Sequence, residues 1–209
     1  MDSITQGVLG AAIGEAILGK SIGNKGAIIG ATVATIPDLD VMLYLFYDKL
    51  EMLSIHRGLS HSIVFSILGA FFIAYVLSKI KWSQGIEFNK LLLFSWLCLF
   101  THMLLDAFTA YGTQLFLPLN NRRVGFDSIN VVDPVYTIPL IIGLILSMWV
   151  YRSKSKRSMF NRYGLLLSSC YLVFTLLNKE SVKADISKSL AEEKIEYNSL
   201  LTMPVGIAN

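Results

Sequence analysis

Charged residues are scarce in this chain. They make up 16% of its 209 residues, against roughly 25% in soluble domains. Apolar residues make up 54%, and the mean hydropathy is +0.56. A single large soluble core would need far more charged surface, so the composition favours an all-α, polytopic transmembrane helical bundle. The net charge of +3 is too small to indicate a nucleic-acid partner.

Cysteine is also rare, and the two present, Cys98 and Cys170, lie in apolar runs without ligand spacing. We interpret them as small buried side chains rather than a disulfide or a metal-binding pair. The first residues, Met1-Asp2-Ser3, lack the basic stretch of a cleavable signal peptide, and we expect none.

Apolar segments are frequent. Residues 4–19 and 26–36 are short and rich in glycine and alanine, which predicts a tight hairpin of small-residue helices. Longer spans are expected at 62–80, 91–110 and 134–151, with a shorter one at 163–177. From Lys179 onward the sequence becomes rich in charged residues. We therefore expect a membrane domain at 1–178 and an extramembrane tail at 179–209, which is either a natural short tail or part of a larger domain.

Basic residues lie at alternate links between these segments. The three basic links are Lys20 with Lys25, Lys79 with Lys81 and Lys90, and the run 152–162. If all three are cytoplasmic, the spans alternate without conflict. Every acidic or histidine-bearing segment end then faces outward, on the far side of a bacterial inner membrane.

Histidine occurs three times, and each occurrence is at a segment end. His102 and Asp106 are spaced i, i+4, on one face of a helix and within reach of one ion. His56 and His61 belong to the stretch HRGLSHS, where Ser60 is a candidate helix cap. Imidazole and carboxylate ligands suit zinc, with manganese or iron as alternatives. The plainer interpretation is a His–Asp hydrogen bond between helices.

Two carboxylates, Asp38 and Asp40, follow Pro37 at the end of an apolar segment. They predict either a solvated turn or part of a cation site. Arg57 and Arg123 are candidates for binding an anionic group, or for contact with lipid headgroups. Asp133-Pro134 predicts a helix start, and Asp133 is a second-tier site residue.

The motifs together resemble the YdjM-type bacterial inner-membrane proteins. The matching pieces are Ile36-Pro37-Asp38-Leu39-Asp40, the heptad from His56 to Ser62, Thr101-His102-Met103-Leu104-Leu105-Asp106, Thr109, Tyr111-Gly112-Thr113, Leu117-Pro118 and Asp133-Pro134-Val135-Tyr136-Thr137. The resemblance covers about residues 1–150. It implies a metal-dependent hydrolase. The spacing of His102 and Asp106 is also distantly similar to that in zinc-dependent phospholipase C and the fungal single-strand nucleases.

The chain departs from the family pattern near its start. Many family members have a histidine after a threonine there, whereas Thr5 is followed by Gln6. Gln6 is therefore a second-tier site residue. Longer members also continue into a larger C-terminal domain.

The expected function is a membrane-bound, zinc-dependent hydrolase with His56, His61, His102 and Asp106 as ligands. Asp38 or Asp40 would act as general base. Membrane lipid is the expected partner, and a phosphoester or lipid headgroup at the outer face is the expected substrate. The alternative is a non-catalytic metal-binding membrane protein, such as a sensor, a transport component or an envelope stress factor. A transporter would place its ligands near mid-membrane.

Overall fold

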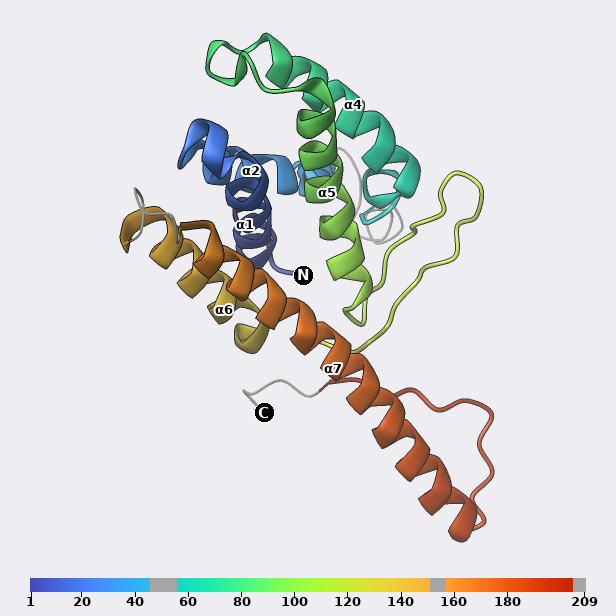
Figure 1. Cartoon of the computed structure of the whole chain (residues 1–209). Helices are drawn as coiled ribbons and strands as arrows, with labels where there is room; N and C mark the ends of the chain where they lie inside the picture. Colours follow the sequence, from blue (N-terminus) through green and yellow to red (C-terminus); the bar gives the residue numbers. More distant parts are fainter. Residues whose placement is uncertain (46–55, 151–156, 205–209) are drawn as a thin grey trace.

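The computed structural model describes residues 1–45, 56–150 and 157–204. Three helical hairpins form its body (Figure 1): α1 (Ser3–Ile22) with α2 (Lys25–Ala34), α4 (Ile63–Lys79) with α5 (Phe88–Ala107), and α6 (Pro134–Ile145) with α7 (Arg157–Glu192). Short helices lie in the connections between these six helices: η1 (Pro37–Leu45), η2 (Leu59–His61), η3 (Lys81–Ser83) and the π-helix η4 (Leu146–Val150). The described residues contain isolated bridges but no strand, so the all-α prediction is confirmed.

The first hairpin depends on glycine at its helix contacts. A Cβ atom on Gly14 would lie 2.0 Å from the carbonyl oxygen of Gly26, and one on Gly10 would lie 2.3 Å from that of Gly30. Any side chain there would clash with backbone. Small residues let the two backbones touch, as helices packed in lipid require. The expected small-residue hairpin is present.

Capping side chains fix where two further helices begin. The Ser62 hydroxyl accepts a hydrogen bond from the Phe65 amide and caps α4, so the prediction that Ser60 caps this helix is wrong. At α6, Asp133 accepts from the amides of Val135 and Tyr136. Pro134 fills the first helical position, where no amide hydrogen is needed, as predicted.

Helix α7 is long. Its 36 residues span about 54 Å at 1.5 Å per residue. It starts beside α6 and projects beyond the bundle with its charged half (Figure 1). The expected boundary at residue 178 lies inside this unbroken helix. Whether the tail is a domain of its own stays a prediction.

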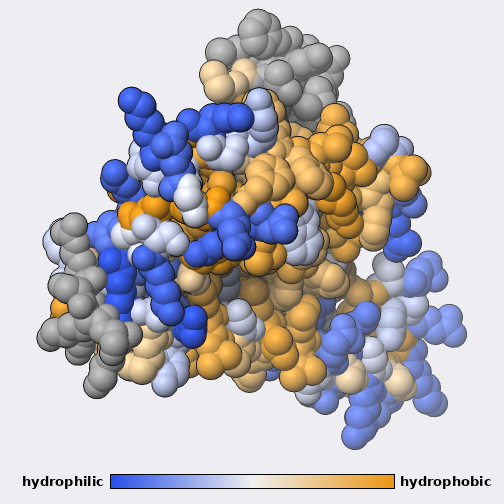
Figure 2. All heavy atoms as spheres, turned by 45° about the horizontal axis from the view of Figure 1, so that its top comes forward, coloured by the Kyte–Doolittle hydropathy of each residue, from blue (hydrophilic) through white to orange (hydrophobic). Residues whose placement is uncertain are grey.

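Two helices, α5 and α7, are long and apolar enough to cross a membrane. Shorter apolar helices cover Lys25–Ala34, Ile63–Lys79 and Pro134–Val150. Large apolar side chains are exposed on several helices, including Phe72 on α4, Ile142 on α6 and Leu177 on α7. Figure 2 shows broad apolar areas between patches of hydrophilic residues. The expected multi-pass topology remains a prediction, because only two helices in the described part of the chain are both long and apolar enough to cross a membrane.

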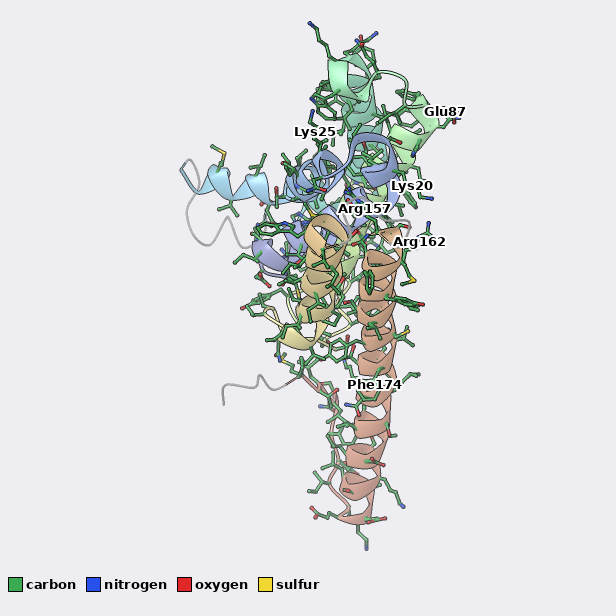
Figure 3. All side chains as sticks on the ribbon, turned by 60° about the vertical axis from the view of Figure 1, so that its left-hand side comes forward. Lys20, Lys25, Glu87, Arg157, Arg162 and Phe174 are labelled. Atoms are coloured by element: carbon green, nitrogen blue, oxygen red, sulfur yellow. The ribbon has the colours of Figure 1, made fainter. Side chains whose placement is uncertain are left out.

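The two ends of the bundle differ in chemistry. Lys20, Lys25, Arg157 and Arg162 gather around one end (Figure 3). There Arg157 pairs with buried Glu15, its Nε lying 2.6 Å from Glu15 Oε1. The starts of α1, α4 and α6 and the ends of α2 and α5 meet at the opposite end, because the hairpins are antiparallel. The histidine-bearing segments are therefore brought together by topology.

Candidate metal centre

Four side chains from three elements converge at this second end. Asp38 comes from η1, His61 from η2, and His102 and Asp106 from the last turns of α5. Each offers one ligand atom, and the four atoms lie within 4.8 Å of one another. His61, His102 and Asp106 are fully buried, and Asp38 is partly buried. The i, i+4 spacing on α5 supplies half of the group, as the sequence predicted.

Five of the six separations among these ligand atoms are close to those expected for donors that bind one zinc ion. The two Nε2 atoms are 3.1 Å apart, and Asp106 Oδ2 lies 3.2 Å from His61 Nε2 and 3.6 Å from His102 Nε2. Asp38 Oδ1 lies 3.6 Å from His61 Nε2 and 3.3 Å from His102 Nε2. Zinc–ligand bonds of about 2.0–2.1 Å give tetrahedral edges of about 3.3–3.4 Å. An N₂O₂ donor set of this size fits zinc.

Unpaired polar atoms support the same fit. Among the described residues, Asp106 Oδ2 has no hydrogen-bond partner, although it is buried and faces the group. A buried carboxylate oxygen left in this way is costly unless a cation binds it. The amino nitrogen of Met1 contacts the other oxygen, Asp106 Oδ1. A positively charged group of the protein, the Met1 amino group, therefore already lies beside this carboxylate.

The charged states of Asp38 on η1 and His61 on η2 also favour a bound cation. Burial alone would raise the pKa of Asp38, but its contacts with His102 and His61 outweigh burial and hold that pKa well below its ordinary value. Burial would lower the pKa of His61, but Asp106 and Asp38 raise it overall. The carboxylates therefore stay ionised at neutral pH and favour positive charge between them.

His56 does not join this group, contrary to the predicted ligand set. Its Nδ1 lies 2.9 Å from Asp40 Oδ1, and its ring centroid is 6.0 Å from that of His61. On η1, with three residues per turn, side chains two positions apart point about 120° away from each other. Asp38 therefore faces His102 while Asp40 faces His56.

Asp40 reaches the group indirectly, through Ser60. The Ser60 hydroxyl donates to Asp40 Oδ2 at 2.7 Å and lies 2.9 Å from His61 Nδ1. Such contacts fix the orientation of a ligating imidazole whose other nitrogen meets the ion. This role of Ser60 was not predicted from the sequence, where Ser60 was only a candidate helix cap. Its position directly before His61 was the available signal.

Arg57 also contacts the group. Its Nη2 lies 3.2 Å from Asp106 Oδ1, and its Nη1 donates to the Thr109 hydroxyl at 3.1 Å. The residue is 7% exposed and has a positive φ of 62°, a backbone conformation that costs energy outside glycine. Arg123 lies nearby and donates to the His56 carbonyl at 3.0 Å. Arg57 therefore lies directly beside the Asp106 carboxylate, and Arg123 lies against the backbone of His56.

The two second-tier residues take different places. Gln6 is fully buried, and its amide nitrogen donates to the His102 carbonyl at 3.1 Å, so it supports the ligand-bearing turn of α5. Asp133 lies outside the group, where it caps α6 and accepts a hydrogen bond from the Tyr171 hydroxyl at 2.9 Å. The role of Asp133 as the cap of α6 is a sufficient reason for a carboxylate at this position.

Comparisons with known proteins agree with the sequence motifs. A family model described as YdjM inner membrane protein matches residues 1–182. A curated relative, the uncharacterized protein YfhP of Bacillus subtilis (strain 168), is 28% identical over 200 residues. The alignment covers 92% of this chain and 59% of YfhP, so the chain spans less than two thirds of that relative. No solved structure gives a significant match.

Proposed function

Because the chain belongs to the YdjM family of inner membrane proteins, we propose that it is a membrane-embedded, zinc-dependent hydrolase of phosphoesters. The observation that carries the proposal is the group of four ligand atoms from Asp38, His61, His102 and Asp106. These residues hold the ion. When bound, zinc would take a water molecule or a substrate oxygen as a ligand in addition to these protein atoms, and it would supply Lewis-acid chemistry that polarises the substrate oxygen or makes the water acidic.

The protein's own proton donor and acceptor is His56. The carboxylates first considered for this task are otherwise engaged. Asp38 Oδ1 faces the histidine nitrogens, and both Asp40 oxygens accept hydrogen bonds. The His56 side chain is 29% exposed, and Asp40 at its Nδ1 fixes the ring. Its Nε2 is then free to exchange a proton with a leaving group, as a general acid–base residue requires.

The flanking arginines favour an anionic substrate. Arg57 carries its charge in a buried position beside Asp106, and it is therefore a positioning residue for that ligand as well as a source of positive potential. Arg123 is less buried and lies against the backbone of His56, the proposed proton donor and acceptor. Guanidinium groups bind phosphate oxygens in a planar, bidentate manner. A lipid headgroup phosphoester fits a centre at one end of a membrane bundle.

We further propose a multi-pass topology with the metal centre on the outer side. Lys20, Lys25 and Arg157 (Figure 3) lie at the connections α1–α2 and α6–α7, whereas the centre lies beyond the end of α2 and at the end of α5. Cytoplasmic loops carry an excess of lysine and arginine. The exposed apolar faces of α4, α6 and α7 then contact lipid.

Metal analysis and activity assays on the same preparations test this proposal. The full chain, purified in detergent, should contain one zinc per chain, and His102→Ala and Asp106→Ala should contain almost none. Hydrolysis of lipid phosphoesters should require zinc, stop with chelator, and be lost in both variants. Asp127→Asn is the matched control, because this carboxylate lies outside the centre and pairs with Lys179. It should keep both zinc and activity.

The assay pair also separates the alternative. A chain that binds zinc stoichiometrically but hydrolyses no ester across a broad set of headgroups would be a metal-binding sensor or scaffold. Wild-type protein that binds no divalent metal would refute both functions.

A further inference from the structure

The connection after α5 is an ordered loop with paired flanks. Thr109 bridges to Ile129, and Thr113 pairs with Val124 through two backbone hydrogen bonds of 2.9 and 2.8 Å. Between these pairings the chain projects from the bundle beside α4 (Figure 1). Residues 116–123 form the tip of this loop. The pairing at its base holds the tip in a defined place.

The tip exposes large apolar side chains. Leu119 is 91% exposed and Phe116 is 51% exposed. Single exposed apolar residues are ordinary on protein surfaces. Here two of them lie within four residues in the tip of this loop, and the described residues leave Leu119 almost fully and Phe116 about half uncovered. Such a tip is suited to an apolar partner.

The charges around the tip have one sign. Residues 114–126 contain Arg122 and Arg123 and no acidic residue. The next carboxylate, Asp127, pairs with Lys179 at 3.2 Å. Apolar side chains flanked by arginine are the combination that binds the surface of an anionic bilayer. The apolar groups enter the acyl boundary, and the Arg122 guanidinium remains at the phosphates.

The position of the loop identifies the bilayer. Helix α5 has 20 residues and ends at Ala107, directly before the loop. It is about 30 Å long, the thickness of the hydrocarbon core. A loop that begins where this helix ends lies at the membrane surface. We propose that the tip 116–123 folds back into the headgroup layer of the membrane that α5 crosses and binds anionic lipid there.

This contact would couple the metal centre to the membrane surface. The Gln114 amide donates to the Arg57 carbonyl at 3.1 Å, and the Ile63 amide donates to the Leu115 carbonyl at 2.9 Å. Arg123 holds the His56 carbonyl. The loop therefore contacts the segment that carries His56 and His61. A lipid-bound tip would set the height of this segment against the headgroups, whether or not the centre is catalytic.

Spin labels on single cysteines test the proposal in the full chain. Leu119→Cys carries the test label, in a Cys98→Ala, Cys170→Ser background reconstituted into nanodiscs of phosphatidylcholine and phosphatidylglycerol. Lys188→Cys, on the projecting charged half of α7, is the aqueous control. Phe72→Cys, on the exposed apolar face of α4, is the lipid control. Collision rates with oxygen and with a water-soluble nickel complex are measured at each label.

The label at position 119 should meet oxygen as often as the label at position 72. Its collision rate with the nickel complex should be several-fold lower than at position 188. Removing phosphatidylglycerol, or adding Arg122→Gln, should raise nickel access at position 119 alone. Nickel access equal to that at position 188 would overturn the proposal. Protection from both reagents would also overturn it, because it would mean that protein, such as a second copy of the chain, covers the tip.

Discussion

Replacing Asp38 by Asn distinguishes the role that the structure supports from the role first expected. A general base can be lost without loss of the metal. A ligand cannot, because an amide is neutral and binds zinc poorly. Asp38 Oδ1 lies 3.3 Å from His102 Nε2 and 3.6 Å from His61 Nε2. Asp40 reaches His61 only through Ser60 or at 3.6 Å from Nδ1, the nitrogen facing away from the group.

These positions set the expected order of effects. Loss of a group that orients a ligand costs roughly 10- to 100-fold in metal affinity, so Asp40→Asn should lie in that range. Asp38→Asn should exceed it. At a zinc concentration of about 1,000 times the wild-type Kd, binding stabilises the protein by about 4.1 kcal/mol. A 100-fold weaker site keeps only about 1.4 kcal/mol of that stabilisation by the same relation.

The assay is a chelator competition titration in detergent, paired with thermal unfolding with and without zinc. Asp127→Asn again serves as the control. The expected order of affinity is wild type and Asp127→Asn, then Asp40→Asn, then Asp38→Asn. If Asp38→Asn binds zinc as tightly as wild type and Asp40→Asn does not, the assignment of the two carboxylates is reversed and the proposed ligand group is wrong.

Three further predictions follow from other contacts. His56→Ala should keep its zinc but lose roughly 10²- to 10⁴-fold in hydrolysis rate; loss of zinc in proportion to activity would make His56 a ligand after all. Gly14→Ala should destabilise the first hairpin by about 1–3 kcal/mol, measured by SDS unfolding, because its Cβ would meet backbone at 2.0 Å. Gly7→Ala, with its nearest contact at 3.9 Å, should be neutral, and equal effects would contradict the close packing. In intact cells, an impermeant thiol reagent should label Lys188→Cys but not Lys81→Cys, and the opposite pattern would reverse the proposed orientation.

Local sequence signals were sufficient for most of the helices. Apolar runs predicted α4, α5 and α6, and the glycine- and alanine-rich composition of residues 4–19 and 26–36 predicted the close contact of α1 and α2. These features depend on neighbours three or four residues apart, which a single sequence displays. Helix α7 is the exception. Its change from apolar to charged composition suggested a boundary near residue 178, but helix hydrogen bonding continues through both textures and does not depend on hydropathy.

The metal centre likewise has one part that the local sequence determined and one part that only the tertiary structure decided. The pairing of His102 with Asp106 was determined by the sequence, because both lie on one helix and its period fixes their common face. The partners from other segments were not. Asp38 and Asp40 are chemically equivalent, as are His56 and His61, and only the direction of the short helices η1 and η2 decides which of each pair turns towards α5. That direction is set by how the antiparallel hairpins meet at one end of the bundle, a contact between distant segments that no local pattern records.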